Sequence, residues 1–542
     1  MSLTLSAAIL KTTKHTSLGG LRATVDNRRH AGDDAEYAVD TTRLDDAGLQ
    51  ELAAAAEKHG DGKAARAIEA IRLARSGDFA KAVPSFKAFA GILHELLTTD
   101  IIDGWIYVVG QDGNYYPELV TDIHLDAGIS GRGKAYPTVT IKTSYYGRTE
   151  TGYRETFGSA RGSHVFSAQE VVKRRVGDAL AAAGFYKETP ALKAEYEASM
   201  RRYAAEVAPA FGEQFRVSGI PYAYEEDNYK RRTAELHRRR VIHDMDESSY
   251  GTKAAFVESR LFDDDPAAIP DHPLLRVFDL ATHEFLWVHS DQMEPYQYDL
   301  TLSDKLILPK THRDLLDVLT TNLDAFTADI IEGKSAGNVI LAKGIPGVGK
   351  TLTAEVYSEL IKRPLYSIHS GTIGTTAEDI EKSLREVFMR GKRWRCVLLL
   401  DEADVFVVKR GNNLEQNAIV AEFLRTLEYF DGLLFMTTNR PDDIDEAIIS
   451  RCAAIIDYVP PGPKDSAAIW AVMAHQYEAK LDQPLIDQLV TLFPDIAPRD
   501  IKMMFRLALR VANSRSEALS LDTFRQCAMF RAIRMADSDA GA

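Results

Sequence analysis

The sequence GIPGVGKT at residues 344–351 constrains the fold more than any other feature of the chain. It follows the apolar run VILA and precedes the helix-like run TLTAEVYSELI, so it has the spacing and the strand-to-helix setting of a phosphate-binding loop. Glycines allow backbone N–H groups to turn inward around phosphate oxygens, and the following helix directs its partly positive N-terminus at the same anion. The motif therefore predicts a nucleoside-triphosphate site.

The residues of this loop have separate expected roles. Lys350 should reach the β- and γ-phosphates, and Thr351 should ligate Mg²⁺ through its hydroxyl oxygen. The residues expected to bind the nucleotide are Gly344, Ile345, Pro346, Gly347, Val348, Gly349, Lys350, Thr351 and Leu352.

A pair of acidic residues follows a second apolar run. VLLL at residues 397–400 leads directly into Asp401 and Glu402, and a buried parallel strand delivers such residues at the edge of the sheet where nucleotides bind. We expect Asp401 to lie near Mg²⁺ and Glu402 to orient and polarise the attacking water. A later run, LLFMTTNR, ends at Asn439, which is expected to sense the γ-phosphate or to help position the water.

Short apolar runs alternate with helix-like segments through this part of the chain. The runs are NVILA, PLYSIHS, CVLLLDEAD, GLLFMTTNR and AAIIDYV. Such alternation is typical of a parallel sheet with helices on both faces. The sequence PPGP at residues 460–463 ends the pattern, and residues 464–535 are predicted to be helical.

The length of 542 residues exceeds what one hydrophobic core usually supports, so several domains are expected. The predicted fold class is multidomain α/β, with a P-loop parallel-sheet core and a C-terminal helical lid, preceded by α+β N-terminal domains. The expected division is residues 1–98 (a tail and a small helical unit), 99–213 (an α+β domain), 214–301 (a second, mostly β or α/β domain), 302–460 (the large P-loop subdomain) and 461–542 (the helical lid and a short tail).

The N-terminal part is interpreted from changes in its residue pattern. Residues 1–45 are polar and expected to be irregular, whereas the Ala-rich residues 42–97 favour a helical hairpin. Aromatic and β-branched runs within residues 105–157 predict an antiparallel sheet, and residues 214–300 predict further strands. The segment HRDLLDVLTTNLDAFTADIIEG predicts an amphipathic helix that ends at Gly333.

Composition limits the partners that the chain can have. The apolar fraction of 45% and the charged fraction of 27% are those of an ordinary soluble protein. No stretch approaches the roughly 20 apolar residues of a membrane helix. The first residues lack a basic region before their apolar patch, which favours the cytoplasm over export. The net charge of −14 argues against a nucleic-acid-binding surface that extends over the whole chain.

The motifs GIPGVGKT, LLLDEAD and MTTNRPDDIDEAIISR, with the helical tail, resemble the AAA+ ATPases and are most similar to the AAA clade. The resemblance covers residues 302–534. It implies ATP and Mg²⁺ as cofactors and ATP hydrolysis as the activity, with Asn439 as the sensor 1 residue. It also implies that Arg451 is an arginine finger, which reaches the ATP of a neighbouring subunit in a homo-oligomeric, hexameric ring. A surface salt bridge is the alternative role for Arg451.

The sequence differs at two sites from the motifs that are usual in the AAA clade. Arg499, in the sequence APRDI, lies where a sensor 2 arginine would bind the phosphates, whereas the clade more often has Gly-Ala-Asp there. The pore of the family usually carries an aromatic residue, an apolar residue and glycine, but SIHSGTIGTTAED offers only Ile373 and Gly374. Whether a polypeptide is threaded through the ring is therefore left open.

The residues that precede the AAA+-like part of the chain do not identify the substrate. The densest basic run lies at residues 230–240, where a helix would spread the charges around its circumference, and a solvated face is the alternative to a nucleic-acid surface. His283 and His289 are expected to be structural. The predicted function is a ring motor that remodels, disassembles or unfolds a protein recruited through residues 1–300. The alternatives are a nucleic-acid-linked ATPase and a nucleotide-controlled assembly scaffold.

Overall fold

The computed structural model divides the chain into two compact units. The N-terminal unit comprises residues 1–211 and 215–294, and the C-terminal unit comprises residues 212–214 and 295–542. The structure describes residues 3–27, 35–73, 75, 77–126, 129–130, 133–134, 136–151, 154–224, 235–246, 269–321, 338–374 and 376–536. No helix within these ranges is long and apolar enough to traverse a bilayer.

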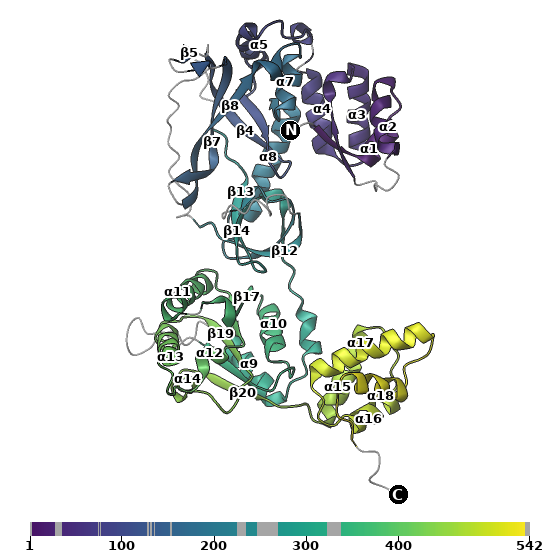
Figure 1. Ribbon diagram of the computed structural model, residues 1–542, viewed down its shortest axis with the longest axis vertical. Helices are drawn as coiled ribbons and strands as arrows, with labels where there is room; N and C mark the ends of the chain where they lie inside the picture. The colour runs from purple at the N-terminus through teal and green to yellow at the C-terminus, as the bar shows by residue number, and fades with distance from the viewer. Residues whose placement is uncertain are drawn as a thin grey trace. The chain divides into compact units, whose positions relative to one another are not determined.

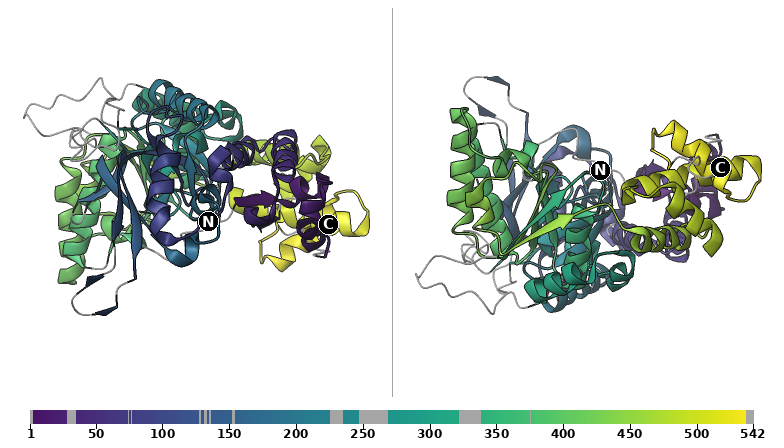
Figure 2. Two further views of the ribbon diagram at one scale, coloured as in Figure 1. Left: turned by 90° about the horizontal axis from the view of Figure 1, so that it is seen from above. Right: turned by 90° about the horizontal axis from the view of Figure 1, so that it is seen from below.

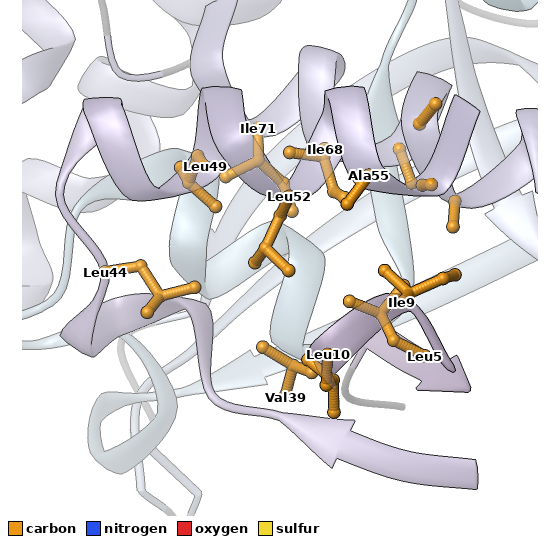
Figure 3. Packing of buried hydrophobic residues seen from close by; sticks show 14 of the residues in the cluster. Leu5, Ile9, Leu10, Val39, Leu44, Leu49, Leu52, Ala55, Ile68 and Ile71 are labelled. Atoms are coloured by element: carbon orange, nitrogen blue, oxygen red, sulfur yellow. The ribbon is translucent and has the colours of Figure 1, made fainter. Parts of the chain in front are cut away.

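The N-terminal unit begins with a small sheet packed against helices. Strand β1 (Leu3–Ser6) pairs antiparallel with β2 (Glu36–Val39), and the helices are α1 (Ala7–Thr12), α2 (Gly19–Asn27), α3 (Asp46–Lys58) and α4 (Gly62–Leu73). Their apolar side chains point toward one another in Figure 3, which labels Leu5, Ile9, Leu10, Val39, Leu44, Leu49, Leu52, Ala55, Ile68 and Ile71. The expectation that residues 1–45 are irregular is therefore wrong, because their few apolar side chains are buried against the α3–α4 hairpin.

A buried ion pair fixes this first segment to a distant helix. The guanidinium of Arg75 donates from Nε to Asp178 Oδ1 at 3.0 Å, and Asp178 lies in α7 (Val176–Ala182). The same guanidinium donates to the backbone oxygens of Leu44 at 3.0 Å and Thr41 at 2.6 Å. Because both charged side chains are almost completely buried, the added hydrogen bonds offset much of the cost of removing the charges from water.

The larger sheet of this unit has five strands in the order β8-β7-β4-β3-β9. The strands are β3 (Trp105–Val109), β4 (Tyr115–Asp126), β7 (Thr138–Thr151), β8 (Arg154–Ser167) and β9 (Phe185–Lys187), and neighbours pair antiparallel. Helix α5 (Phe86–Thr98) buries Phe89 and Leu93 with side chains from the sheet. The core thus crosses residue 98, where the sequence suggested a boundary.

A second sheet has the order β11-β14-β13-β12-β10-β15. Its strands are β10 (Gln214–Gly219), β11 (Ala223–Tyr224), β12 (Leu236–His243), β13 (Leu274–Asp279), β14 (Phe285–His289) and β15 (Met293–Pro295). Part of the basic run at residues 230–240 therefore lies in a strand and not in a helix, while residues 230–234 fall outside the described ranges. Arg239 donates to the buried carboxylate of Asp279 at 2.9 Å, so this charge is bound within the sheet.

The C-terminal unit contains the predicted parallel sheet. Its strands have the order β17-β18-β19-β16-β20, and all the neighbours pair parallel. They are β16 (Asn338–Gly344), β17 (Leu365–His369), β18 (Val397–Asp401), β19 (Leu433–Thr438) and β20 (Ala454–Tyr458). Helices α9 (Lys310–Thr321), α10 (Lys350–Leu360), α11 (Ala377–Arg393) and α13 (Leu414–Leu427) surround this sheet (Figure 1). Because β19 lies between β16 and β18 and all three run parallel, their carboxyl ends meet at one edge of the sheet.

The last four helices form one bundle, coloured light green to yellow (Figures 1 and 2). They are α15 (Pro463–Gln476), α16 (Gln483–Leu492), α17 (Pro498–Arg515) and α18 (Leu521–Phe530). Trp470, Phe505 and Phe524 meet at its centre, where their ring contacts include an edge-to-face pair of Trp470 and Phe524 with centroids 5.4 Å apart. Residues 322–337, which include the predicted end of a helix at Gly333, lie outside the described ranges.

Candidate nucleotide site

The loop between β16 and α10 has a backbone that only glycine accepts easily. Gly344 and Gly347 have φ angles of 147° and 86°, in the region that L-residues rarely adopt. A Cβ on Gly344 would lie 2.2 Å from the backbone oxygen of Tyr458, and a Cβ on Gly347 would lie 2.9 Å from Arg499 Cβ. The glycines therefore bring the loop close to both β20 and α17.

The side chain of Lys350 is held inside this loop. Its Nζ donates to the backbone oxygens of Gly344 at 2.7 Å and Ile345 at 2.8 Å, and to Asn439 Oδ1 at 2.9 Å. The three acceptors match the three N–H donors of an ammonium group. Burial lowers the pKa of Lys350 from its ordinary value, and the nearby carboxylate of Asp401 opposes that shift. The structure thus brings two of the predicted catalytic residues into contact.

A hydroxyl and a carboxylate meet beside this lysine. Thr351 Oγ1 donates to Asp401 Oδ1 at 2.9 Å, and Thr437 Oγ1 lies 2.6 Å from the same carboxylate oxygen. Because the Thr351 hydroxyl gives its hydrogen to Asp401, its lone pairs are available to a cation. Hydroxyl and carboxylate oxygens are the ligands that Mg²⁺ prefers, so this pair fits the predicted magnesium site.

Glu402 lies at a turn with an unusual backbone. Its φ angle is +54°, and its backbone N–H donates to Thr437 Oγ1 at 2.9 Å. The next residue, Ala403, donates its N–H to the backbone oxygen of Thr437 at 2.8 Å. The turn that carries Glu402 is therefore fastened to the neighbouring strand β19.

Two polar residues of this network were missed by the sequence analysis. Thr437 contacts both predicted acidic residues, while the Asp404 carboxylate accepts from the Thr438 hydroxyl and from the Asn439 N–H, the latter at 3.1 Å. Asp404 is visible in the motif DEAD as a third acidic residue. Its role was not recognisable because these bonds join the start of α12 (Asp404–Val407) to the end of β19, more than thirty residues later in the chain.

A cavity of about 590 Å³ lies beside these groups, and Lys350, Thr351 and Thr437 are part of its lining. The lining contains Asp401, Glu402 and Asn439, and every predicted nucleotide-binding residue except Gly344 and Ile345. The sequence analysis did not predict the apolar part of the wall, which includes Leu302, Leu306, Ile307, Leu308, Ile469, Val472 and Met473. The run LIL before α9 was the available signal. A cavity lined by both polar and apolar residues suits a ligand with phosphates and an aromatic base.

Arg499 lies at the start of α17, on the side of the cavity formed by the bundle. Its backbone N–H donates to Gly347 O at 3.1 Å, and its side chain contributes to the lining. Lys502, one helical turn later, adds a second cationic side chain. The bundle is thus in direct contact with the phosphate-binding loop.

Arg451 is placed elsewhere. It follows α14 (Glu446–Ile449), where its guanidinium donates to Ala447 O at 3.1 Å and lies 3.9 Å from Glu428 Oε2. Its side chain is 35% exposed, and within the described ranges it does not line the cavity. The structure does not bring Arg451 to the site of its own chain.

Comparisons with known proteins agree with this geometry. Residues 340–459 match the family model described as "ATPase family associated with various cellular activities (AAA)". A putative 26S proteasome regulatory subunit homolog of Methanothermobacter thermautotrophicus is 28% identical over 30% of this chain and 46% of its own length. The ATPase family AAA domain-containing protein 3 of Caenorhabditis elegans is 25% identical, over 40% of this chain and 36% of its own length.

Fidgetin-like protein 1 of Drosophila melanogaster is also similar, with 28% identity over 31% of this chain and 34% of its own length. The chain therefore spans less than half the length of each of these relatives.

Proposed function

We propose, since residues 340–459 form an AAA domain, that this protein hydrolyses ATP and uses the energy to remodel or disassemble another protein. The observation that carries the proposal is the hydrogen-bonded set of polar groups in the lining of the cavity. Lys350 bonds to Asn439, and Thr351 and Thr437 both bond to Asp401. These bonds hold together the groups that phosphoryl transfer needs.

Each residue has a proposed part in hydrolysis. The loop N–H groups and Lys350 bind the phosphates, and Thr351 with Asp401 would hold Mg²⁺, which supplies positive charge to the phosphate oxygens when bound. Glu402 accepts a hydrogen bond from the attacking water and orients it, while Asn439 contacts the same region. The apolar wall holds the base, and Arg499 approaches the phosphates from the bundle, which we propose acts as a lid.

Arg451 supports a ring in which neighbouring subunits share a site. Its guanidinium is partly exposed and remote from the cavity of its own chain, so it is available to the nucleotide of a second subunit. We propose a hexamer acting in the cytoplasm. Residues 1–300 are proposed to recruit the protein substrate, because the AAA match begins only at residue 340. The name of the Methanothermobacter relative, a proteasome regulatory subunit homolog, is consistent with work on protein substrates.

Replacement of Glu402 by glutamine tests the proposal. Glu402→Gln keeps the shape of the side chain and removes its ability to act as a base, so ATP should bind while hydrolysis falls by about 10²- to 10⁴-fold. The measurements are phosphate release, nucleotide affinity and the mass of the assembly with ATP. Glu517→Gln is the control, since this exposed residue lies outside the cavity lining. Wild-type turnover by Glu402→Gln would show that the assignment of the base is wrong.

A further inference from the structure

Thr437, the penultimate residue of β19, contacts both acidic residues of the site. We propose that Thr437 is a positioning residue that sets the geometry of Asp401 and Glu402 for hydrolysis. This inference rests on the proposed function. The sheet places it there, because β18 and β19 are parallel and Leu400 pairs with Met436, one residue before Asp401 and Thr437.

The directions of the hydrogen bonds are determined by their chemistry. A carboxylate only accepts, so the Thr437 hydroxyl donates its hydrogen to Asp401 Oδ1 at 2.6 Å. Thr437 Oγ1 in turn accepts from the Glu402 N–H at 2.9 Å, and the backbone oxygen of Thr437 accepts from the Ala403 N–H at 2.8 Å. Three consecutive residues, 401 to 403, are therefore bound to one threonine.

The backbone of Glu402 makes these bonds consequential. A residue other than glycine at a φ angle of +54° is strained, and such a conformation persists only where the surrounding structure determines it. The bonds to Thr437 and the complete burial of Ala403 hold Glu402 in this conformation. The direction in which the Glu402 side chain leaves the backbone thus depends on the Thr437 hydroxyl.

Solvent has little access to this hydroxyl. Thr437 is only 2% exposed, so its removal would leave the Glu402 N–H without a partner and Asp401 Oδ1 with Thr351 alone. The Mg²⁺ ligand and the base would both lose their alignment. A shift of about 1 Å in a reacting group reduces a rate by roughly 100-fold, so the effect should appear in kcat rather than in KM.

The test compares Thr437→Val with Thr437→Ser in the full chain. Valine has nearly the same shape and suits a strand but lacks the hydroxyl, whereas serine retains it. Thr320→Val is the control, because Thr320 is similarly buried and, among the residues that the structure describes, its hydroxyl bonds only to Leu316 O of its own helix. The measurements are kcat and KM for ATP, and the affinity for a fluorescent ATP analogue with and without Mg²⁺.

Thr437→Val should lower kcat by roughly 10- to 100-fold with little change in KM. It should keep the Mg²⁺-free affinity for the analogue and lose most of the gain in affinity that Mg²⁺ provides. Thr437→Ser should retain most of the wild-type kcat, and Thr320→Val should match the wild type.

Equal kcat and an equal Mg²⁺ gain in Thr437→Val and the wild type would overturn the inference, as would failure of serine to restore kcat. If the wild type binds the analogue but releases no phosphate, the proposed function fails. The Mg²⁺ gain in affinity then still tests Thr437.

Discussion

The close approach of the phosphate-binding loop to α17 predicts the effect of one added methyl group. Gly347→Ala places a Cβ at a φ angle of 86°, which costs about 1–2 kcal/mol for an L-residue. That Cβ would also lie 2.9 Å from Arg499 Cβ, so the hydrogen bond from Arg499 N–H to Gly347 O must lengthen. Loss of that bond adds about 1 kcal/mol, for a total of about 2–3 kcal/mol.

Unfolding of the full chain with and without nucleotide shows whether this free-energy cost appears in stability or in nucleotide affinity. If the loop keeps its conformation, the free energy of unfolding of the variant falls by the whole amount. If the loop relaxes, the cost moves to nucleotide affinity, where about 2–3 kcal/mol is a loss of roughly 30- to 150-fold. Urea unfolding with and without a saturating, non-hydrolysable ATP analogue captures both, because ligand binding adds to the unfolding free energy. The unfolding free energy of the nucleotide-saturated variant should therefore fall by about 2–3 kcal/mol in either case.

Gly411→Ala is the matched control, since Gly411 has an ordinary φ angle and open space around its Cβ position. It should unfold and bind nucleotide as the wild type does. If Gly347→Ala also did both, the described contact between the loop and Arg499 would be refuted.

Two further predictions concern residues on either side of α14, Arg451 and Asp445. Arg451→Ala should lower kcat roughly 1,000-fold, as expected for an arginine finger, and a phosphate-release assay checks this. Its unfolding midpoint should not change, because a half-exposed contact of 3.9 Å to Glu428 contributes little. Hydrogen bonds from the Arg410 guanidinium lower the pKa of Asp445, the N-cap of α14. Because this folded-state pKa lies below the unfolded value of about 3.9, the stabilisation is present above that pH and disappears as the pH falls through the folded pKa. The melting temperature of Asp445→Asn should therefore fall less steeply than that of the wild type as the pH is lowered from 6. An equally steep fall would contradict the role of the Arg410–Asp445 pair.

The parallel sheet and most groups at the cavity were predictable because their signals are local. A strand, a glycine-rich loop and a helix follow one another at residues 338–360, and parallel strands bring Asp401 and Asn439 to the same edge. Thr437 was not predictable in the same way, because its position within an apolar strand says nothing about which neighbour its hydroxyl contacts. Its role depends on the register of β18 against β19.

The secondary structure expected for the basic run at residues 230–240 was wrong for a different reason. Strand β12 contains adjacent arginines, and Arg238 has a φ angle of +47°, which interrupts the alternation by which strands are recognised. The expectation that the first 45 residues are irregular was wrong because their burial depends on partners such as Tyr186 and Leu192, far along the chain. Local periodicity does not report such partners.

The ion pair between Arg75 and Asp178 also affects the order in which the N-terminal unit is completed during synthesis. Its members are 103 residues apart in the chain, and the same core includes Leu192 in α8 (Pro190–Arg202). A nascent chain emerges from the N-terminus, so the first helices wait for α7 and α8 before their apolar faces are covered. Until residue 192 has left the ribosome, the apolar faces of this segment lack part of their final cover, so the yield of folded protein should respond to the rate of translation.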